Sequence, residues 1–409
     1  MIALAWRNLW RQGRRSLISI FAVAVVVFYA LVMYSFGGAM MNGMYQDLTD
    51  QVGNAQVRIQ GYREASSFEN GLLEDAAEVR ATIQQVLPDA ILVGGLQVPA
   101  LLSGEDRSRG LAIQGQDWPA DLREAFGADF LAEGAFVAGN NLTGIMLGRS
   151  LATALEVSLG DDVYVYAPGV TGYGAAAYTV EGLLDFADPT REIASAYISL
   201  PAAQELAAPD AVTRLELHFP DVNTLEQDAE SAANLAALRG ALPENTVVEG
   251  WRELDPALAS LVRIFTPYIL VISIIFFVLA GLLVLNTVYL STLERVREFG
   301  VILSLGAPGR RVVGMVTLES VLLCLTGAAV GLATALPLIW AGRDGFRMPG
   351  YSEEMLAQFN LPAVWYLSTE PWQIILAVAF AVLTAIFAAL GPARMAANIE
   401  PAEAMRYTA

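Results

Sequence analysis

The sequence has no lysine and holds a single histidine and a single cysteine among its 409 residues. Without lysine it cannot have a P-loop lysine, a Schiff-base lysine or a Ser-Lys pair. One His and one Cys cannot make a zinc site of the usual kind or an internal disulfide. His218 lies in the strand-like run TRLELHF, and Cys324 lies in an apolar run where a thiol acts as a small apolar residue. We therefore expect no catalytic residues and no metal site.

Charged residues are also scarce, at 16% of the chain, whereas hydrophobic residues make up 55%. This balance is too apolar for an ordinary soluble enzyme and indicates a membrane protein. Four apolar runs reach the roughly 20 residues that a spanning helix needs, and we predict spans at residues 17–40, 263–290, 312–341 and 372–391. The first run follows arginines, as a signal peptide would. Because it is longer than a signal core and lacks a clear A-x-A cleavage site, we interpret it as a retained anchor.

The arginines are placed asymmetrically around these runs. Four precede the first span and four lie between the second and third spans: Arg7, Arg11, Arg14 and Arg15, and Arg295, Arg297, Arg310 and Arg311. By the positive-inside rule both segments are cytoplasmic, and an even number of spans places the C-terminus there too. We therefore predict a multi-pass membrane protein with both termini in the cytoplasm.

Residues 41–262 then form one large domain outside the cytoplasm. This domain holds 11 arginines and 33 acidic residues, a net charge of −22, while the rest of the chain carries +4. Such acidity argues against nucleic acid as a partner. Strand-like runs such as residues 54–62 alternate with helix-like runs such as residues 74–87, and the length suggests two subdomains. The predicted fold is four transmembrane helices, one plus three, with a large α+β domain inserted between the first and second.

Three shorter segments complete the predicted organisation. Residues 1–16 place Ile2, Trp6, Leu9 and Trp10 on one helical face, which favours a cytoplasmic helix lying against lipid headgroups. A simple flanking anchor is the alternative. Residues 342–371 form a loop outside the cytoplasm, and residues 392–409 form a cytoplasmic tail.

The third span contains two features that bear on helix packing. Gly327 and Gly331 have the G-x-x-x-G spacing that lets another helix approach closely, either within the chain or in a dimer. Glu319 lies about 12 Å into the same span. An intramembrane carboxylate is a functional candidate by default, and a hydrogen bond to a neighbouring helix is the alternative that we favour.

The connection at residues 291–311 is more than a tight hairpin. Leu293, Val296, Phe299 and Ile302 recur at intervals of three, which predicts a short amphipathic helix with opposite charges paired on its polar face. Gly306 and the following proline should end this helix. A connection between antiparallel spans needs only a few residues. The polar face therefore points to a cytoplasmic protein partner, although an interfacial helix without a partner stays open.

Four motifs in order resemble those of a known family. They are RNLWRQGRRSL before the first span, MLGRSLATALEVSLGDDVYV in the outer domain, LERVREFGVILSLGAPGRRVVGMVTLES between spans two and three, and GPARMAANIEPAEAMRY at the end. Together they resemble the FtsX-like/MacB-type (type VII) ABC transporter permeases, and the layout is similar to the LolC/LolE lipoprotein-releasing subunits. Gly391 stands where an aromatic is common and Met405 where Leu is usual, and the loop after the third span is long. These departures weaken any choice of subfamily.

The resemblance implies a non-catalytic permease subunit of a bacterial inner membrane, and residues 41–262 would be a MacB-like periplasmic core domain. Two copies of a separate ABC ATPase would bind ATP and Mg, and this chain would bind no cofactor. A second permease, identical or paralogous, and a periplasmic chaperone or adaptor are further expected partners. The segment at 291–311 would be the coupling helix that docks on the ATPase. The coupling residues so implied are Glu294, Arg295, Arg297, Glu298, Phe299, Gly300, Leu305, Gly306 and Arg310.

The resemblance also implies mechanotransmission, in which ATP-driven closure moves the outer domain. For the substrate, lipoprotein release is the favoured expectation, with MacB-like efflux of drugs or peptides or FtsX-like regulation of cell-wall hydrolases as alternatives. An enzyme working with carboxylates alone is a third class. A candidate substrate cleft, for which ordinary packing of the first two spans is the alternative, comprises Met33, Phe36, Met40, Met44, Phe265, Ile269 and Ile272.

Overall fold

The computed structural model describes residues 13–399 except 66, 74, 138, 187–188, 221, 223, 226, 353–354, 357–360 and 363. The chain divides into two compact units, a helical unit and a sheet unit. The helical unit comprises Met1–Met40, Leu261–Arg347 and Val364–Ala409, and the sheet unit comprises Met41–Ser260 and Met348–Ala363. Most of the predicted segments at 1–16 and 392–409 lies outside the described residues.

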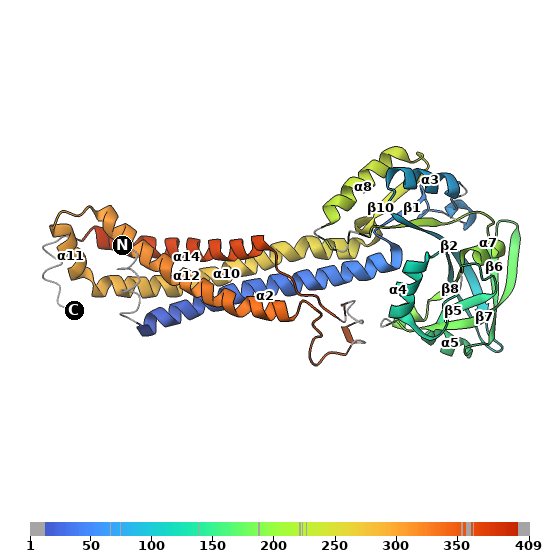
Figure 1. Ribbon diagram of the computed structural model, residues 1–409, viewed down its shortest axis with the longest axis horizontal. Coiled ribbons are helices and arrows are strands. Elements are labelled where there is room, and N and C mark those ends of the chain that lie inside the picture. Colours follow the sequence, from blue (N-terminus) through green and yellow to red (C-terminus); the bar gives the residue numbers. More distant parts are fainter. Residues whose placement is uncertain are drawn as a thin grey trace. The chain divides into compact units, whose positions relative to one another are not determined.

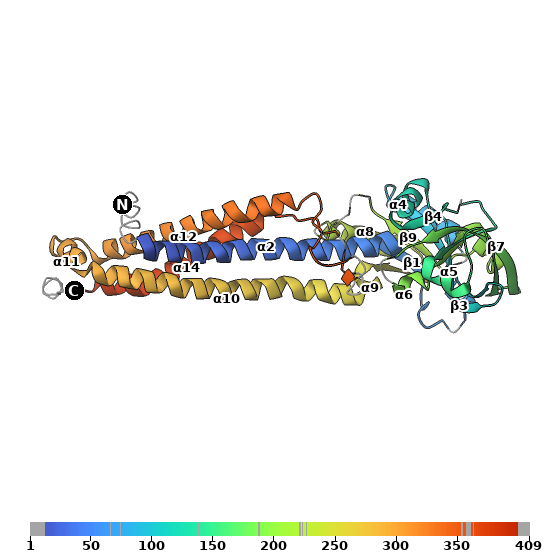
Figure 2. The same cartoon turned by 90° about the horizontal axis from the view of Figure 1, so that it is seen from below.

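Within the described residues, four helices are long and apolar enough to cross a membrane, as predicted. They are α2 (Gly13–Val52), α10 (Pro256–Glu294), α12 (Gly309–Ala341) and α14 (Pro371–Ala397) (Figures 1 and 2). A short helix, α11 (Val296–Ser304), lies between α10 and α12 at the end of the helical unit where α2 begins.

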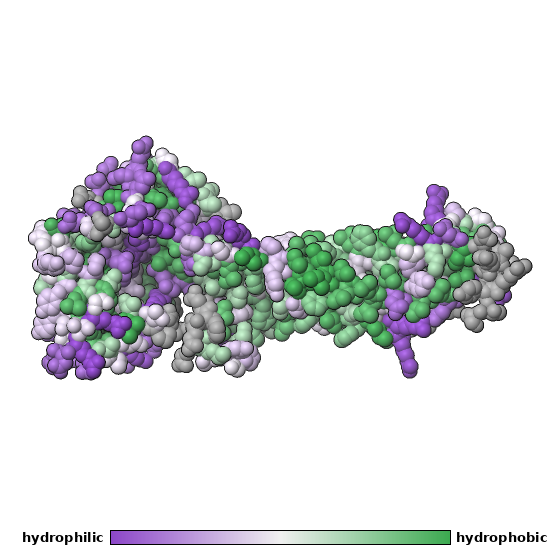
Figure 3. Space-filling view, turned by 180° about the vertical axis from the view of Figure 1, so that it is seen from behind, coloured by the Kyte–Doolittle hydropathy of each residue, from purple (hydrophilic) through white to green (hydrophobic). Residues whose placement is uncertain are grey.

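Small residues let α12 and α14 pack closely together. The buried face of α14 is lined by alanines, including Ala381, Ala385 and Ala389. Other apolar side chains of the helical unit are exposed. Val278 and Leu282 of α10 and Phe387 of α14 are each more than half exposed. Figure 3 shows hydrophobic residues over most of the middle of this unit. In water such a surface would be costly, so these side chains suit contact with lipid or another membrane subunit.

The helices continue beyond the predicted spans. α2 runs on to Val52 and ends at Gly53, whose φ of +77° favours glycine and whose N–H donates to the Thr49 carbonyl at 2.9 Å. Polar residues replace apolar ones in this extension, but helical spacing persists and Tyr45 stays fully buried. α14 likewise continues through Pro392, where the last span was expected to end.

The sheet unit is built on one ten-stranded sheet. Its order is β10-β1-β9-β2-β3-β8-β5-β7-β4, and β6 pairs with β2 and β7. The strands are β1 (Ala55–Ile59), β2 (Ile91–Ser103), β3 (Ser108–Gln116), β4 (Leu131–Gly134), β5 (Gly144–Gly148), β6 (Asp162–Gly169), β7 (Gly172–Leu184), β8 (Ala196–Ser199), β9 (Arg214–His218) and β10 (Thr246–Gly250). The neighbours pair antiparallel except β3 with β8 and β5 with β7, which are parallel.

Helices surround this sheet and complete the α+β unit, in agreement with the predicted fold. They are η1 (Glu69–Gly71), α3 (Ala76–Val86), α4 (Ala120–Phe130), α5 (Arg149–Leu155), α6 (Pro189–Glu192), α7 (Leu200–Leu206), α8 (Asp228–Ala241) and α9 (Trp251–Leu254). The period-two run at residues 54–62 became β1, and the helical run at 74–87 became α3.

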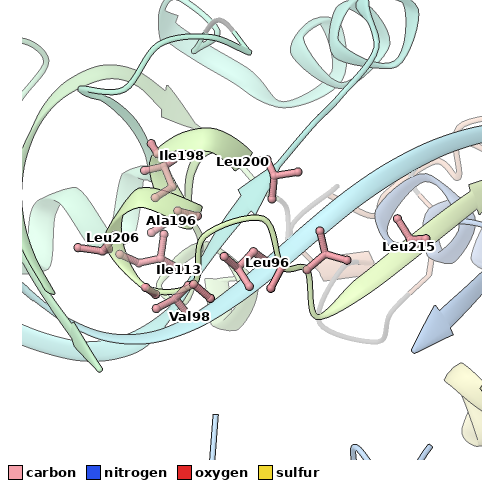
Figure 4. Packing of buried hydrophobic residues seen from close by; sticks show 14 of the residues in the cluster. Leu96, Val98, Ile113, Ala196, Ile198, Leu200, Leu206 and Leu215 are labelled. Atoms are coloured by element: carbon pink, nitrogen blue, oxygen red, sulfur yellow. The ribbon is translucent and has the colours of Figure 1, made fainter. Parts of the chain in front are cut away.

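Two hydrophobic clusters hold the sheet unit together. The larger one includes Leu96, Val98 and Ile113 from paired strands, packed against Leu200 and Leu206 of α7 (Figure 4). The smaller one gathers Phe126, Val137, Met146, Leu184 and Phe186. One continuous sheet connects both clusters, so subdomains within this unit would share a sheet.

Candidate coupling site

The connection between α10 and α11 is a single buried arginine. α10 ends at Glu294 and α11 begins at Val296, and Arg295 between them departs from helical backbone angles, with φ −108° and ψ 15°. This break in the helix changes the direction of the chain between α10 and α11. Because Arg295 is only 9% exposed, its charge needs partners nearby.

Arg295 has carboxylate partners on both sides. Its Nε donates to Oε2 of Glu298 at 2.9 Å, and its Nη1 donates to both oxygens of Glu319 at 2.9 and 2.8 Å. Its guanidinium also lies 5.0 Å from the ring centroid of Phe299, close enough for a cation–π contact. Arg295 therefore links α11 to α12 by charge-assisted hydrogen bonds.

Glu319 thus bonds to Arg295, at the start of the neighbouring helical segment. Its side chain is 16% exposed. From the sequence we favoured a hydrogen bond from Glu319 to a neighbouring helix; the partner in the structure is Arg295, between α10 and α11. Sequence reasoning did not identify Arg295 as the partner, because the two residues are 24 positions apart and helical spacing relates only residues within a few turns.

The apolar face predicted for this segment is buried at its centre, while Leu293 of α10 and Ile302 are half-buried. Val296 and Phe299 are 7% and 0% exposed, and Gly300 beside them is also buried. α11 is in contact with α14. Among the nine predicted coupling residues, Arg295, Phe299 and Gly300 therefore hold α11 in place and are not available for docking.

The remaining predicted coupling residues lie on the surface. They are Glu294, Arg297, Glu298, Leu305, Gly306 and Arg310. Leu305 is 82% exposed and Val301, one turn earlier, is 44% exposed. The outer side of α11 thus offers apolar side chains flanked by charges of both signs, a composition that suits a protein interface.

A glycine ends α11, as the sequence predicts. Gly306 has φ +85°, its N–H donates to the Leu303 carbonyl at 3.0 Å, and the Ala307 N–H donates to the Ile302 carbonyl at 3.3 Å. These two bonds form a Schellman motif, which requires the left-handed conformation that glycine adopts at low cost. Pro308 follows as the N-cap of α12 and stops continuation of α11.

The first helix is fixed to its neighbours in two places. Near the start of α2, Arg15 pairs with Glu294 at 2.6 Å, and the Ser19 and Thr287 hydroxyls are 2.6 Å apart. Further along, Gly327 and Gly331 of α12 face α2, since a Cβ on Gly331 would lie 2.6 Å from the Ala24 carbonyl oxygen. The G-x-x-x-G pair therefore packs within the chain.

The predicted substrate-cleft residues lie partly in the packing of α2 against α10. A Cβ on Gly37 would lie 2.0 Å from the Phe265 ring and 3.0 Å from Ile269, so the helices are in close contact there. Phe36 packs edge-to-face on Phe346 and Trp365, with centroids 5.3 and 5.9 Å apart. The other four, Met33, Met40, Met44 and Ile272, are half-buried.

Sequence reasoning missed an apolar recess between α10 and α14. Its volume is about 370 Å³, and its lining includes Phe277, Leu282, Phe380 and Phe387. Gly281 opens space on α10, where a Cβ would lie 3.0 Å from Thr384. Residue patterns show that each helix is apolar. They do not show which faces of two neighbouring helices leave a recess between them.

The two rare side chains take structural positions. His218 is on β9, with Nε2 3.9 Å from Oε2 of the buried Glu216, and Cys324 is fully buried within α12. Among the residues that the structure describes, no three His, Cys, Asp or Glu side chains are grouped to hold a metal ion.

Comparisons with known proteins agree with this architecture. Residues 16–244 match the MacB-like periplasmic core domain, and residues 270–401 match the FtsX-like permease C-terminal domain. The chain is 25% identical over 275 residues to the uncharacterized ABC transporter permease YknZ of Bacillus subtilis (strain 168), covering 66% of this chain and 63% of YknZ.

Two further matches involve MacB. The chain is 29% identical over 170 residues to the macrolide export ATP-binding/permease protein MacB of Syntrophobacter fumaroxidans, covering 42% of this chain and 21% of MacB. The chain therefore spans less than two thirds of the length of these curated relatives. The solved periplasmic region of MacB from Actinobacillus actinomycetemcomitans aligns with 49% of this chain and 91% of its own length, at 12% identity and TM-score 0.33.

Proposed function

The chain belongs to the FtsX-like ABC transporter permeases with a MacB-like periplasmic core domain. We propose that it transmits to its outer domain the conformational change that ATP hydrolysis drives in a separate ATPase. In this proposal α11 is the coupling helix. The ATPase binds ATP and Mg, and this chain supplies no catalytic group. The observation that carries the proposal is the combination of an exposed outer side of α11 with a buried connection from α11 to α12.

The outer side of α11 has the features that a docking helix needs. Leu305 and Val301 are exposed on a short helix whose opposite side is anchored by the fully buried Phe299. When a partner covers exposed apolar side chains of this kind, their burial contributes to the free energy of binding. Arg297 and Glu298 beside them would set the partner's orientation.

A displacement of α11 would reach α12 through Arg295. The three hydrogen bonds to Glu298 and Glu319 are partly shielded from water, where charge-assisted bonds resist breaking. Because α2 and α10 each run without interruption from the helical unit into the sheet unit, movement of these helices would be carried to the sheet unit along the chain. This continuity supports mechanotransmission.

The arginine distribution supports a topology with α11 and both termini in the cytoplasm and the sheet unit outside. In a bacterial inner membrane the sheet unit would be periplasmic. The exposed apolar side of α10, with Ile275, Val278 and Leu279 each about half exposed or more, supports contact with lipid and with a second permease, identical or paralogous. Two ATPase copies would match two permeases, and a periplasmic adaptor or chaperone would meet the sheet unit.

For the substrate, we propose a lipoprotein released from the outer leaflet. Half-buried Met33, Met40 and Met44 on one helix support this, because flexible thioethers accommodate varied acyl chains. MacB-like efflux of drugs or peptides is the second candidate, supported by the similarity to MacB. Radiolabelled palmitate in proteins co-purified with the complex would support release. Unchanged lipoprotein localisation after depletion, together with increased drug sensitivity, would support efflux instead.

The coupling proposal is tested by co-purifying the full chain from its native membrane with its ATPase, identified by mass spectrometry as an ABC ATPase. Leu305→Arg should reduce recovery of that ATPase at least about tenfold, because it places a charge in the apolar docking position. Arg343→Gln, an exposed change in the loop after α12, is the matched control and should not alter recovery. Equal recovery with Leu305→Arg would overturn the docking assignment.

A further inference from the structure

One face of the sheet in the sheet unit is polar across neighbouring strands. Period-two alternation turns Val57, Ile113 and Leu215 into the core and their neighbours to the opposite face. Register then aligns these neighbours: Gln56 lies opposite Glu216, Gln97 opposite Gln114, and Gln114 opposite Tyr197. The polar face of such a sheet is usually solvated, but Gln56, Gln116 and Glu216 are at most 6% exposed. Their burial requires a reason.

A recess of about 280 Å³ opens on this face. Its lining includes three arginines, Arg58, Arg191 and Arg214, and the glutamines Gln97 and Gln116. Gly95 makes room for one of the arginines, since a Cβ there would lie 3.1 Å from the Arg214 guanidinium. This volume lies near the lower end of the range for small-molecule sites, so only a small ligand would fit.

Two of the arginines that line the recess differ in how their charges are balanced. Arg214 is neutralised by the buried Glu216, at 2.6 Å from its Nε. Arg58 instead donates Nε and Nη2 to the neutral Oε1 of Gln56, at 3.0 and 2.7 Å. No carboxylate among the described residues forms an ion pair with Arg58. Burial and then the neighbouring Arg214 lower the pKa of Arg58, while Tyr62, Glu249 and Glu216 act in the opposite direction without restoring it.

Gln116 adds an unused acceptor to the recess. It is only 6% exposed, and its Nε2 donates to Oε1 of Glu216 at 3.3 Å. That bond fixes the amide orientation, because a flipped amide would bring two oxygens together. Its Oε1 has no hydrogen-bond partner among the described residues. A buried carbonyl left unpaired costs free energy that a ligand N–H would recover.

We propose that this recess binds a carboxylate attached to an N–H donor, the group found at the C-terminus of a peptide and in an N-acylated amino acid. The carboxylate lies against Arg58 and Arg191, and the N–H donates to Oε1 of Gln116. This site is independent of ATPase coupling, so either assignment can fail without the other.

An occupant would also touch the end of α2. Gln51 and Val52, the last residues of that helix, line the recess, and Nε2 of Gln56 donates to the Val52 carbonyl at 2.9 Å. Binding would therefore order the helix end together with β1, and the sheet unit would gain stability by mass action.

Calorimetric titration of the full chain in phosphatidylcholine nanodiscs tests the proposal. The probes are N-acetylglycylglycine and its uncharged C-terminal amide. We expect saturable binding of the acid and at least about tenfold weaker binding of the amide, because only the acid makes charge-assisted bonds. An octapeptide ending in Gly-Gly separates the sources: its binding indicates a chain end, and its exclusion indicates a small solute.

Two variants and a control locate the site. Arg58→Gln and Gln97→Glu should each weaken acid binding at least about tenfold, whereas Arg107→Gln, an exposed arginine outside the recess paired with Glu156, should leave it unchanged. If Arg58→Gln fails to fold, Gln97→Glu, which keeps every arginine, decides alone. The proposal is overturned if the acid does not saturate, if acid and amide bind equally, if inorganic phosphate binds as tightly, or if Gln97→Glu binds like the wild type.

Discussion

The Arg295 guanidinium lies 2.8 Å from Oε2 of Glu319. This ion pair connects the start of α11 to the first half of α12. Their side chains are only 10% and 16% exposed. Removing one partner from such a pair leaves a charge in a poorly solvated place. The pair therefore adds a side-chain connection to α12 beside the backbone connections of α11 to α10 and α12.

Glu319→Gln should weaken this connection without preventing membrane insertion. We expect a loss of about 1–3 kcal/mol in unfolding free energy, because Arg295 keeps its bond to Glu298 but loses a charged partner. Stimulation of the partner ATPase by the permease should fall several-fold while ATPase binding persists. Denaturant unfolding in detergent and ATPase assays of the reconstituted complex measure these two effects.

Exchanging the charges provides a specific control for that pair. Arg295→Glu combined with Glu319→Arg should recover part of the ATPase stimulation lost in either single variant, since the ion pair can form in reverse. Additive loss in the double variant would show that the two residues contribute independently.

Two changes in α11 should uncouple ATP hydrolysis from movement of the outer domain. Glu298→Arg places a cation beside Arg295, and Val301→Pro removes a backbone donor inside α11 and costs about 3 kcal/mol. One fluorophore attached to the sheet unit and one attached to the ATPase would report the ATP-dependent movement of the outer domain. Normal binding and stimulation of the ATPase by both variants would show that α11 is not the coupling helix.

The glycines of α12 should respond oppositely to alanine. Gly331→Ala brings a Cβ to 2.6 Å from the Ala24 carbonyl, so α2 must move and stability should fall by about 1–3 kcal/mol. Gly314→Ala meets nothing within 4 Å and should stabilise the helix by about 0.5–1 kcal/mol. Thermal unfolding of the two variants compares them. Dissociation of an oligomer by Gly331→Ala, with no change in the stability of the protomer, would instead indicate packing between chains.

Glu216→Gln should give a pH-dependent loss of stability in the sheet unit. Burial acts to raise the pKa of Glu216, but Arg214 and His218 outweigh it and hold this pKa below its ordinary value of 4.5. The stabilisation is therefore complete above that ordinary value and is lost as pH falls through the lowered folded pKa. The difference from wild type should be about 3–5 kcal/mol near pH 7 and should shrink under acid conditions. Unfolding curves at several pH values measure it, and a difference that widens in acid would contradict the assignment.

Local patterns predicted much of the fold. Hydropathy located the four spans, and period-two alternation located strands such as β9, because both signals lie in consecutive residues. Helix limits were less accessible: α2 continues to Val52 since Tyr45 is buried among distant residues such as Trp251, with ring centroids 5.5 Å apart.

The sequence predicts where the candidate coupling site lies along the chain. It does not predict which of its side chains are buried and which are exposed. The sequence places Leu305 and Phe299 in one amphipathic segment, yet only the fold shows that Leu305 is 82% exposed while Phe299 is fully buried. The pairing of Arg295 with Glu319 depends on how α10, α11 and α12 are arranged. Likewise, the arginines of the polar recess come from β1, β9 and α6, so no single stretch of sequence marks them.

Labelling of a cysteine at position 305 tests whether α11 is the docking element for an ATPase. Because Cys324 is the only cysteine and is buried, Leu305→Cys in a Cys324→Ala background gives one accessible thiol, with Arg107→Cys as the matched site in the sheet unit. We predict that bound ATPase slows reaction of residue 305 with a membrane-impermeant maleimide at least about tenfold and leaves residue 107 unaffected. Equal reactivity of residue 305 with and without bound ATPase would contradict it.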